Sequence, residues 1–223
     1  MLLLFYFIPF SLFFSYLFLG MNASPEVLAN TPLPRYNVKD GITVWTAEDC
    51  DELEKRCKAN PSDKAAKDFK DFLFSTINIL GAKSKRAQGI GAVLTSVSKL
   101  HEKFSSSEPV PQKLYILFYQ NQGMGILKTG VKKLFISHPK TNTLVEVEPL
   151  AVLDFFVDDT YQRKGFGKQL FVKVLEEEGL MAHPERLAID RPSEKFLQFL
   201  AKHYHLTQYT PQVNHFVVVL EFF

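Results

Sequence analysis

The chain has 223 residues, of which 46% are hydrophobic and 22% are charged. This composition suits one globular domain with an appendage and excludes a collagen-like, low-complexity or wholly disordered chain. Twenty-six Lys and Arg against 24 Asp and Glu leave a net charge of +2, which argues against a dedicated nucleic-acid binder. Two cysteines, Cys50 and Cys57, are too few for a disulfide scaffold or a zinc cluster, and no metal-ligand spacing is found, so no metal is expected.

Residues 1–20 are apolar at 16 of 20 positions, and the first charged residue is Glu26. Such a run suits a membrane anchor or the core of a signal peptide. It lacks a basic flank and a good cleavage site, so a third interpretation is that translation begins at Met21. We expect a hydrophobic segment at 1–20, an N-terminal lead-in at 21–60 and a single domain at 61–223.

The first regular elements are expected to be helices. Residues 24–46 contain three prolines and few periodic apolar positions, so they are predicted to be part of the lead-in. Asn-Pro-Ser at 60–62 is a helix-start signal. Two amphipathic helices follow, one carrying Phe69, Phe72, Leu73, Ile77 and Leu80, and the next carrying Ile90, Val93, Leu94, Val97, Leu100 and Phe104.

The period then changes to that of strands. Strands are predicted at 113–119 and 131–137, separated by a Gly-containing turn. A long strand over 145–157 is expected to bulge or break at Pro149. The remaining elements alternate: a helix over 165–178, a strand over 187–190, a helix over 193–204 and a strand over 216–222. This order predicts a mixed α/β layer domain.

The most informative stretch is Leu153–Leu170, where a predicted strand runs into the sequence QRKGFG and a helix opens directly afterwards. A helix N-terminus presents unpaired N–H groups and the positive end of the helix dipole. Glycines let the backbone close on a pyrophosphate. The pattern is neither a Walker loop nor a Rossmann fingerprint. The alternative is a Gly-rich turn with solvated basic residues, but the strand and helix around it favour an anion site.

This loop resembles the acetyl-CoA-binding loop of the GNAT acetyltransferase superfamily. Further segments together resemble the α-tubulin N-acetyltransferase family: Gly130–Phe135, Glu146–Phe155, Ala188–Ser193, His203-Tyr204, and Pro211–Asn214 with Phe216. Upstream, Ala87-Gln88 and Thr95-Ser96 match two short family motifs, and the resemblance covers roughly residues 63–223. It implies a GNAT-like mixed, largely antiparallel central sheet flanked by helices.

The resemblance also implies a function. The family moves an acetyl group from acetyl-CoA to a lysine of α-tubulin on the lumenal face of microtubules. The implied partners are therefore α-tubulin and microtubules, and the implied protein is a cytoplasmic monomer on the cytoskeleton, including that of a cilium or flagellum. A membrane is expected only if residues 1–20 are a real anchor.

Site residues carry over by position. Asp190 matches the acidic residue held important for catalysis, and Gln88 matches a glutamine that lines the substrate lysine site. Without the family, Asp190 could cap a helix or pair with Arg191, and Gln88 could face solvent. The positions matched to acetyl-CoA contacts are Phe155, Phe156, Val157, Gln162, Arg163, Lys164, Gly165, Phe166, Gly167, Lys168, Ser193, Lys195 and Lys202.

One position departs from the family pattern. Where the family commonly has a cysteine proposed as a second catalytic group, this chain has Ala151. A lysine side chain has a pKa of about 10.4, so it must lose a proton before its amine can attack a thioester. Direct attack by this amine needs no enzyme nucleophile. We therefore expect direct transfer in a ternary complex with Asp190 as general base. The alternatives are a GNAT enzyme for another protein lysine and an inactive microtubule-binding module.

Overall fold

The computed structural model describes residues 23–102, 110–138, 141, 143–212 and 215–222. The hydrophobic segment 1–20 and the predicted helix end at Phe104 lie outside these residues. Within the described part, no helix has the length and apolar character needed to cross a membrane.

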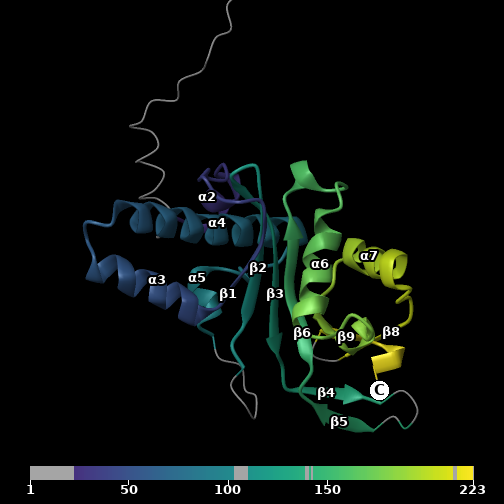
Figure 1. Cartoon of the computed structure of the whole chain (residues 1–223). Helices are drawn as coiled ribbons and strands as arrows, with labels where there is room; N and C mark the ends of the chain where they lie inside the picture. Colours follow the sequence, from purple (N-terminus) through teal and green to yellow (C-terminus); the bar gives the residue numbers. More distant parts are fainter. Residues whose placement is uncertain (1–22, 103–109, 139–140, 142, 213–214, 223) are drawn as a thin grey trace, which may run out of the picture.

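A seven-stranded sheet forms the centre of the molecule (Figure 1). Only β6 and β7 run parallel, and every other neighbouring pair is antiparallel. The prediction of a mixed, largely antiparallel sheet flanked by helices is confirmed. In spatial order the strands are β1 (Gly41–Trp45), β2 (Lys113–Tyr119), β3 (Gln122–Val131), β6 (Leu150–Val157), β7 (Ala188–Asp190), β9 (Phe216–Val219) and β8 (Tyr209–Pro211).

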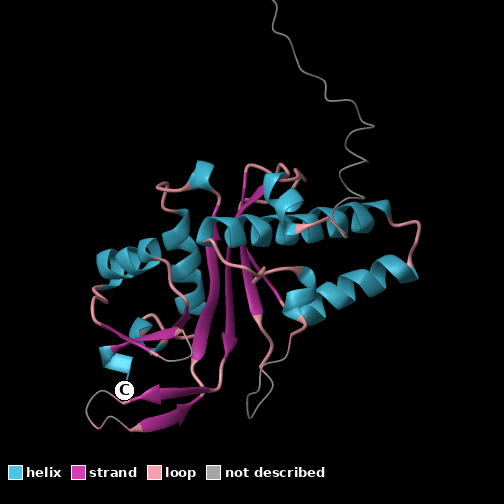
Figure 2. Ribbon diagram, turned by 180° about the vertical axis from the view of Figure 1, so that it is seen from behind, coloured by secondary structure: helices cyan, strands magenta, loops and turns pink. Residues whose placement is uncertain are grey.

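Helices cover both faces of this sheet. The long helix α4 (Lys64–Gln88) crosses one face, and α6 (Phe166–Glu177) packs on the other (Figures 1 and 2). Burial of apolar side chains on both faces provides the main stabilisation. The cluster on the α4 side contains Phe72, Leu73, Ile77 and Phe118, and the cluster on the α6 side contains Leu127, Leu170, Phe171 and Phe196. The further helices are α2 (Pro25–Asn30), α3 (Ala47–Ala59), α5 (Val97–Leu100) and α7 (Glu194–Tyr204).

The segment expected to be irregular at 24–46 contains regular structure. Helix α2 packs on α4, and β1 forms the edge of the sheet beside β2. Helix α3, which was also not predicted, starts with a capping box in which Thr46 and Asp49 bond each other's backbone N–H groups. The apolar periodicity of α2 and β1 is too short to stand out in a sequence, so tertiary packing decides these elements.

The prediction of a second helix from Ile90 to Phe104 is wrong over most of its length. Residues 90–96 are irregular, and only the four-residue α5 is helical. Helix α4 ends at Gly89, whose left-handed φ of 66° closes the last turn. The apolar residues at helical spacing instead belong to a segment that lies against α4, where Asn78 accepts a hydrogen bond from the Val97 N–H at 3.1 Å.

The strand predictions need three corrections. The expected turn between 119 and 131 is mostly β3, because the chain reverses at Gln120 and Asn121, which both have positive φ as in a type I′ turn. The strand predicted at 131–137 is the end of β3 followed by β4 (Leu134–Ser137). The strand predicted at 145–157 is interrupted at Pro149 as expected, but the two parts belong to different sheets, because β5 (Leu144–Val147) pairs with β4 in a separate hairpin before β6 begins.

The C-terminal region differs from the prediction in small details. The final strand ends at Val219 and continues as a short 3₁₀ turn, Leu220–Phe222, while β8 was not predicted. Two further 3₁₀ turns, Asp159–Tyr161 and Pro184–Arg186, flank α6. The predicted helices at 165–178 and 193–204 and the strand at 187–190 are confirmed within one or two residues.

Candidate active site

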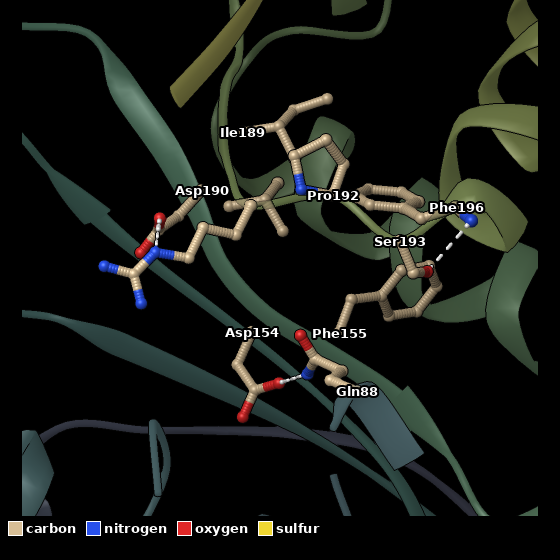
Figure 3. A pocket seen from close by; sticks show the side chains of 10 residues that line it. Gln88, Asp154, Phe155, Ile189, Asp190, Pro192, Ser193 and Phe196 are labelled. Carbon is tan, nitrogen blue, oxygen red and sulfur yellow. Dashed lines mark hydrogen bonds and ion pairs between the residues drawn. The ribbon is translucent and has the colours of Figure 1, made fainter. Parts of the chain in front are cut away.

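A pocket opens where the two parallel strands separate. Strands β6 and β7 pair only at Ala151–Ala188 and Val152–Ile189. Beyond these pairs β6 remains bonded to β3 but has no strand partner among the described residues on the side of β7. The space between them is about 280 Å³, open solvent included. It is lined by Gln88, Val152, Asp154, Phe155, Ile189, Asp190, Arg191, Pro192, Ser193 and Phe196 (Figure 3). Both side chains predicted to be catalytic, Gln88 and Asp190, are among them.

Asp190 is the last residue of β7, and its side chain is 18% exposed. Burial raises the pKa of this carboxyl group, although the positive charges of Arg191 and Lys132 act in the opposite direction. The nearest guanidinium nitrogen of Arg191 lies 3.7 Å from the Asp190 carboxylate. Ser193, not Asp190, caps α7, because the Ser193 hydroxyl accepts the Phe196 N–H at 3.2 Å. Asp190 is therefore not used as a helix cap.

Gln88 lies opposite Asp190, at the last residue of α4. Its amide nitrogen donates to the Ser84 hydroxyl at 2.8 Å and to the Asp154 carboxylate at 2.9 Å. The side chain is thus held in the pocket and does not face bulk solvent. Its amide oxygen is turned away from Asp154, into the pocket (Figure 3).

Sequence reasoning missed two buried charged residues, one in the wall of the pocket and one beside it. Asp154 is 4% exposed, and Lys128 is directly opposite it on β3 and equally buried. The Lys128 ammonium donates to the Leu94 carbonyl. Burial lowers the pKa of Lys128 to about 8, and Asp154 acts against this shift. A charged residue inside an apolar strand run is the signal that could have found both, because such residues are rarely buried without a partner.

Side-chain hydrogen bonds hold the loop before α6 in place. Asp158 accepts the Lys83 ammonium at 2.7 Å and the Thr160 hydroxyl at 2.7 Å. Gln162 bonds the Val157 carbonyl and the Asp159 carboxylate. The loop then enters α6 through Gly165, whose φ is 85°. These bonds fix the chain immediately before the helix.

The N-terminus of α6 has no side-chain cap. Its first backbone N–H groups therefore remain available to an anion. The side chains of Arg163, Lys164 and Lys168 are exposed around it. A Cβ on Gly167 would lie 3.4 Å from the Phe155 ring, which is ordinary contact, so protein packing alone does not require this glycine.

The other residues predicted to contact a cofactor divide by position. Phe155 is half-buried, and its ring packs edge-on against Phe196 with centroids 4.9 Å apart. Val157 and Phe166 belong to the α6-side core, whereas Phe156 packs on the α4 side. Lys195 and Lys202 are exposed on α7 and do not line the pocket.

Ala151 is fully buried and does not line the pocket. It packs in a third apolar cluster, at the base of the β4–β5 hairpin, together with Leu134, Ile136 and Leu153. Its methyl group packs inside this apolar cluster.

Comparison with known proteins identifies the class. A sequence profile described as "GNAT acetyltransferase, Mec-17" matches residues 38–223. The chain is therefore an acetyltransferase of the GNAT class. Within that class it belongs to the Mec-17 family, and the resemblance seen in the sequence is confirmed.

Named relatives agree with this assignment. The chain is 49% identical over 197 residues to the alpha-tubulin N-acetyltransferase of Leishmania braziliensis, covering 88% of this chain and 80% of that protein. It is 50% identical over 191 residues to alpha-tubulin N-acetyltransferase 1 of Trypanosoma cruzi, covering 86% of this chain and 54% of that protein. A solved aminoglycoside acetyltransferase from a soil metagenomic sample shares 12% identity over 76% of this chain and 91% of its own, with a TM-score of 0.38, too distant to carry an argument.

Proposed function

We propose that this chain transfers an acetyl group from acetyl-CoA to a lysine side chain of α-tubulin in microtubules. The observation that carries the proposal is its identity of about half to relatives named for this activity. The pocket supports it, because Asp190 and Gln88 line the same space.

The residues present suit acetyl-CoA as the co-substrate. The uncapped N–H groups of α6 and the glycines at 165 and 167 provide a backbone surface for a pyrophosphate. Arg163, Lys164 and Lys168 supply positive charge beside it. The ring of Phe155 lines the pocket and also lies beside Gly167 of this loop, so the loop and the pocket adjoin.

The chemistry requires a lysine amine without its extra proton. Burial raises the pKa of Asp190, which makes its carboxylate a stronger base than an exposed one. In the proposed step the lysine nitrogen forms a bond to the acetyl carbon, and the carbon–sulfur bond breaks to release CoA. The proton lost from nitrogen goes to Asp190, directly or through one water. A positioned base of this kind contributes about 10²–10⁴-fold to the rate.

The site suits a mechanism without a protein nucleophile. Ala151 lies in the core of the hairpin cluster, and direct attack needs no thiol there. We propose that the protein works in the cytoplasm on microtubules, including those of a cilium or flagellum, as a monomer.

The test is acetylation of microtubules by the chain with acetyl-CoA, beside Asp190→Asn, with acetyl-lysine measured by mass spectrometry. Activity in the first and a loss of about 10²-fold or more in the second would support both the substrate and the base. Acetyl-CoA binding without tubulin acetylation would favour another lysine substrate. Microtubule co-sedimentation without cofactor binding would favour an inactive binding module.

A further inference from the structure

A buried carboxylate, Asp154, lies in the wall of the pocket on the side of α4. One oxygen of Asp154 accepts the Ser84 hydroxyl at 2.6 Å and the Gln88 amide N–H at 2.9 Å. Its other oxygen accepts the Thr95 hydroxyl at 2.5 Å. Hydrogen bonds to an ionised acceptor are stronger than neutral ones, so the three donors are held firmly.

A β-bulge turns this carboxylate toward α4. Asp154 pairs with Lys128 and Val152 pairs with Thr129, which leaves Leu153 as the extra residue on β6. Val152 and Phe155 consequently both belong to the α6-side core, although strict alternation would place them on opposite faces. Asp154, directly before Phe155, therefore lies on the α4 side.

The donors come from two segments that approach closely. Ser84 and Gln88 are one helical turn apart on α4, so both reach the same carboxylate oxygen. Thr95 arrives from the irregular segment 90–96, which touches α4 at Gly81. A Cβ on Gly81 would lie only 1.7 Å from the Thr95 carbonyl oxygen, so glycine is needed for this approach.

This arrangement fixes the orientation of the Gln88 amide. A carboxylate accepts hydrogen bonds and donates none, so the NH₂ end of Gln88 must face Asp154. The carbonyl end then faces the pocket, as drawn in Figure 3. A carbonyl oxygen there can accept a hydrogen bond from a lysine amine or ammonium, whereas an amide NH₂ group cannot accept one.

We propose that Asp154 is a positioning residue, which holds Gln88 with its amide oxygen toward the incoming lysine. The proposal rests on the proposed function, since it assigns Gln88 to the acceptor side of the pocket. Asp154 also lines the pocket, but its proposed effect on the reaction is exerted through the orientation of Gln88. Ser84 shares this role as the second acceptor for the Gln88 amide.

The kinetic test is a double-mutant cycle on the full chain, with Asp154→Asn, Gln88→Ala and the double variant assayed on microtubules. Asp154→Asn is expected to lower kcat/KM for the acceptor lysine by about tenfold, or about 1.4 kcal/mol. The reason is that asparagine has both a donor and an acceptor, so the Gln88 amide can flip and present its NH₂ group to the pocket. Acetyl-CoA affinity is expected to stay unchanged. In the Gln88→Ala background, Asp154→Asn should cost less than about twofold. Equal losses in both backgrounds would overturn the proposal.

A second readout needs no turnover and so separates this proposal from the proposed function. The side-chain amide resonance of Gln88, assigned by its absence in Gln88→Ala, reports the bond to Asp154. It should shift and lose protection from solvent exchange in Asp154→Asn. An unchanged resonance in a folded variant would overturn the positioning role, whether or not tubulin is the substrate.

Two milder variants guard against a failure of Asp154→Asn to fold. Thr95→Val removes a donor from Asp154 but leaves the Gln88 bond, so stability should fall while kcat/KM stays within about threefold. Ser84→Ala removes a direct partner of Gln88, so it should lower kcat/KM and shift the amide resonance in the same direction as Asp154→Asn. The opposite ranking of these two variants would contradict the proposal.

Discussion

The two sides of the pocket are built in different ways. On the α6 side, the N-terminus of the helix is uncapped, its glycines lack side chains, and its basic residues are exposed. On the α4 side, Ser84, Thr95 and Asp154 are all buried, and the two hydroxyls both donate to the Asp154 carboxylate. The first side offers open backbone groups to a ligand, and the second holds side chains in place for it. Substitutions on the first side should therefore change binding, and those on the second should also change folding.

The largest effect is expected where the two sides are joined. Lys83 on α4 and Asp158 before the loop form an ion pair with side chains 18% and 8% exposed. Lys83→Met should lower the free energy of unfolding by about 3 kcal/mol at pH 7, because it leaves a buried carboxylate unpaired. Lys85→Met is the control, since its partner Glu26 is exposed and a solvent-screened pair should contribute much less than the buried one. Equal losses in the two variants, measured by urea unfolding, would contradict this ranking.

The same pair predicts a pH dependence. Burial alone would raise the pKa of Asp158, but the Lys83 ammonium and the Thr160 hydroxyl and N–H lower it below the ordinary value of 3.8. Its contribution to stability is therefore complete above that value and is lost as the pH falls through the lowered pKa. The difference between wild type and Lys83→Met should shrink in acid. Unfolding curves at pH 7 and in acid would show this.

The next effect concerns the close approach on the α4 side. Gly81→Ala should destabilise the chain by about 2 kcal/mol, because a new Cβ would push the Thr95 backbone away from α4. The gain in helix propensity offsets only about 0.5–1 kcal/mol of this cost. Gly91→Ala, where a Cβ meets nothing within 4 Å, should leave stability within about 0.5 kcal/mol. Thermal unfolding of both would decide whether Gly81 is needed for packing.

A binding effect without a folding effect is expected on the α6 side. Gly167→Trp should weaken acetyl-CoA binding by about tenfold or more, or about 1.4 kcal/mol, because the new ring fills the loop surface beside Phe155. Glu176→Trp, exposed at the other end of α6, is the matched control and should bind normally. Calorimetric titration with acetyl-CoA measures both. An unchanged affinity in Gly167→Trp would contradict the placement of the cofactor on this loop.

The smallest effect is expected at the start of α7. Ser193→Ala removes the hydroxyl that accepts the Phe196 N–H and should cost about 1 kcal/mol of stability. Ser193→Asp retains a capping oxygen and should recover most of it. Chemical denaturation compares the two, and an Asp variant as unstable as the Ala variant would argue against the cap.

The contrast between the two sides also explains what could be predicted from sequence. The α6 side rests on a contiguous pattern, strand then glycines then helix, so the loop and Gly165 were visible in the sequence. The α4 side joins residues 84, 88, 95 and 154, which meet only through a bulge and a close backbone contact. A bulge and a close backbone contact leave no periodic pattern in the sequence. The apolar residues of segment 90–104 even have helical spacing, which led to a wrong helix prediction. Gln88 and Asp190 were found through the family resemblance, and Asp154 was not.

Because position 151 is a buried alanine, no cysteine among the described residues lines the pocket, and this affects how the activity can be measured. The chain has two cysteines, Cys50 and Cys57, and both are buried in α3, away from the pocket. Burial, helped by Asp49 and Asp51, raises the pKa of Cys50 to about 12, so at neutral pH it is almost entirely in the unreactive thiol form. Chromogenic thiol reagents should therefore report released CoA continuously without reacting with the buried cysteines of the folded chain. Alkylating agents should likewise leave the two buried cysteines of the folded chain unmodified.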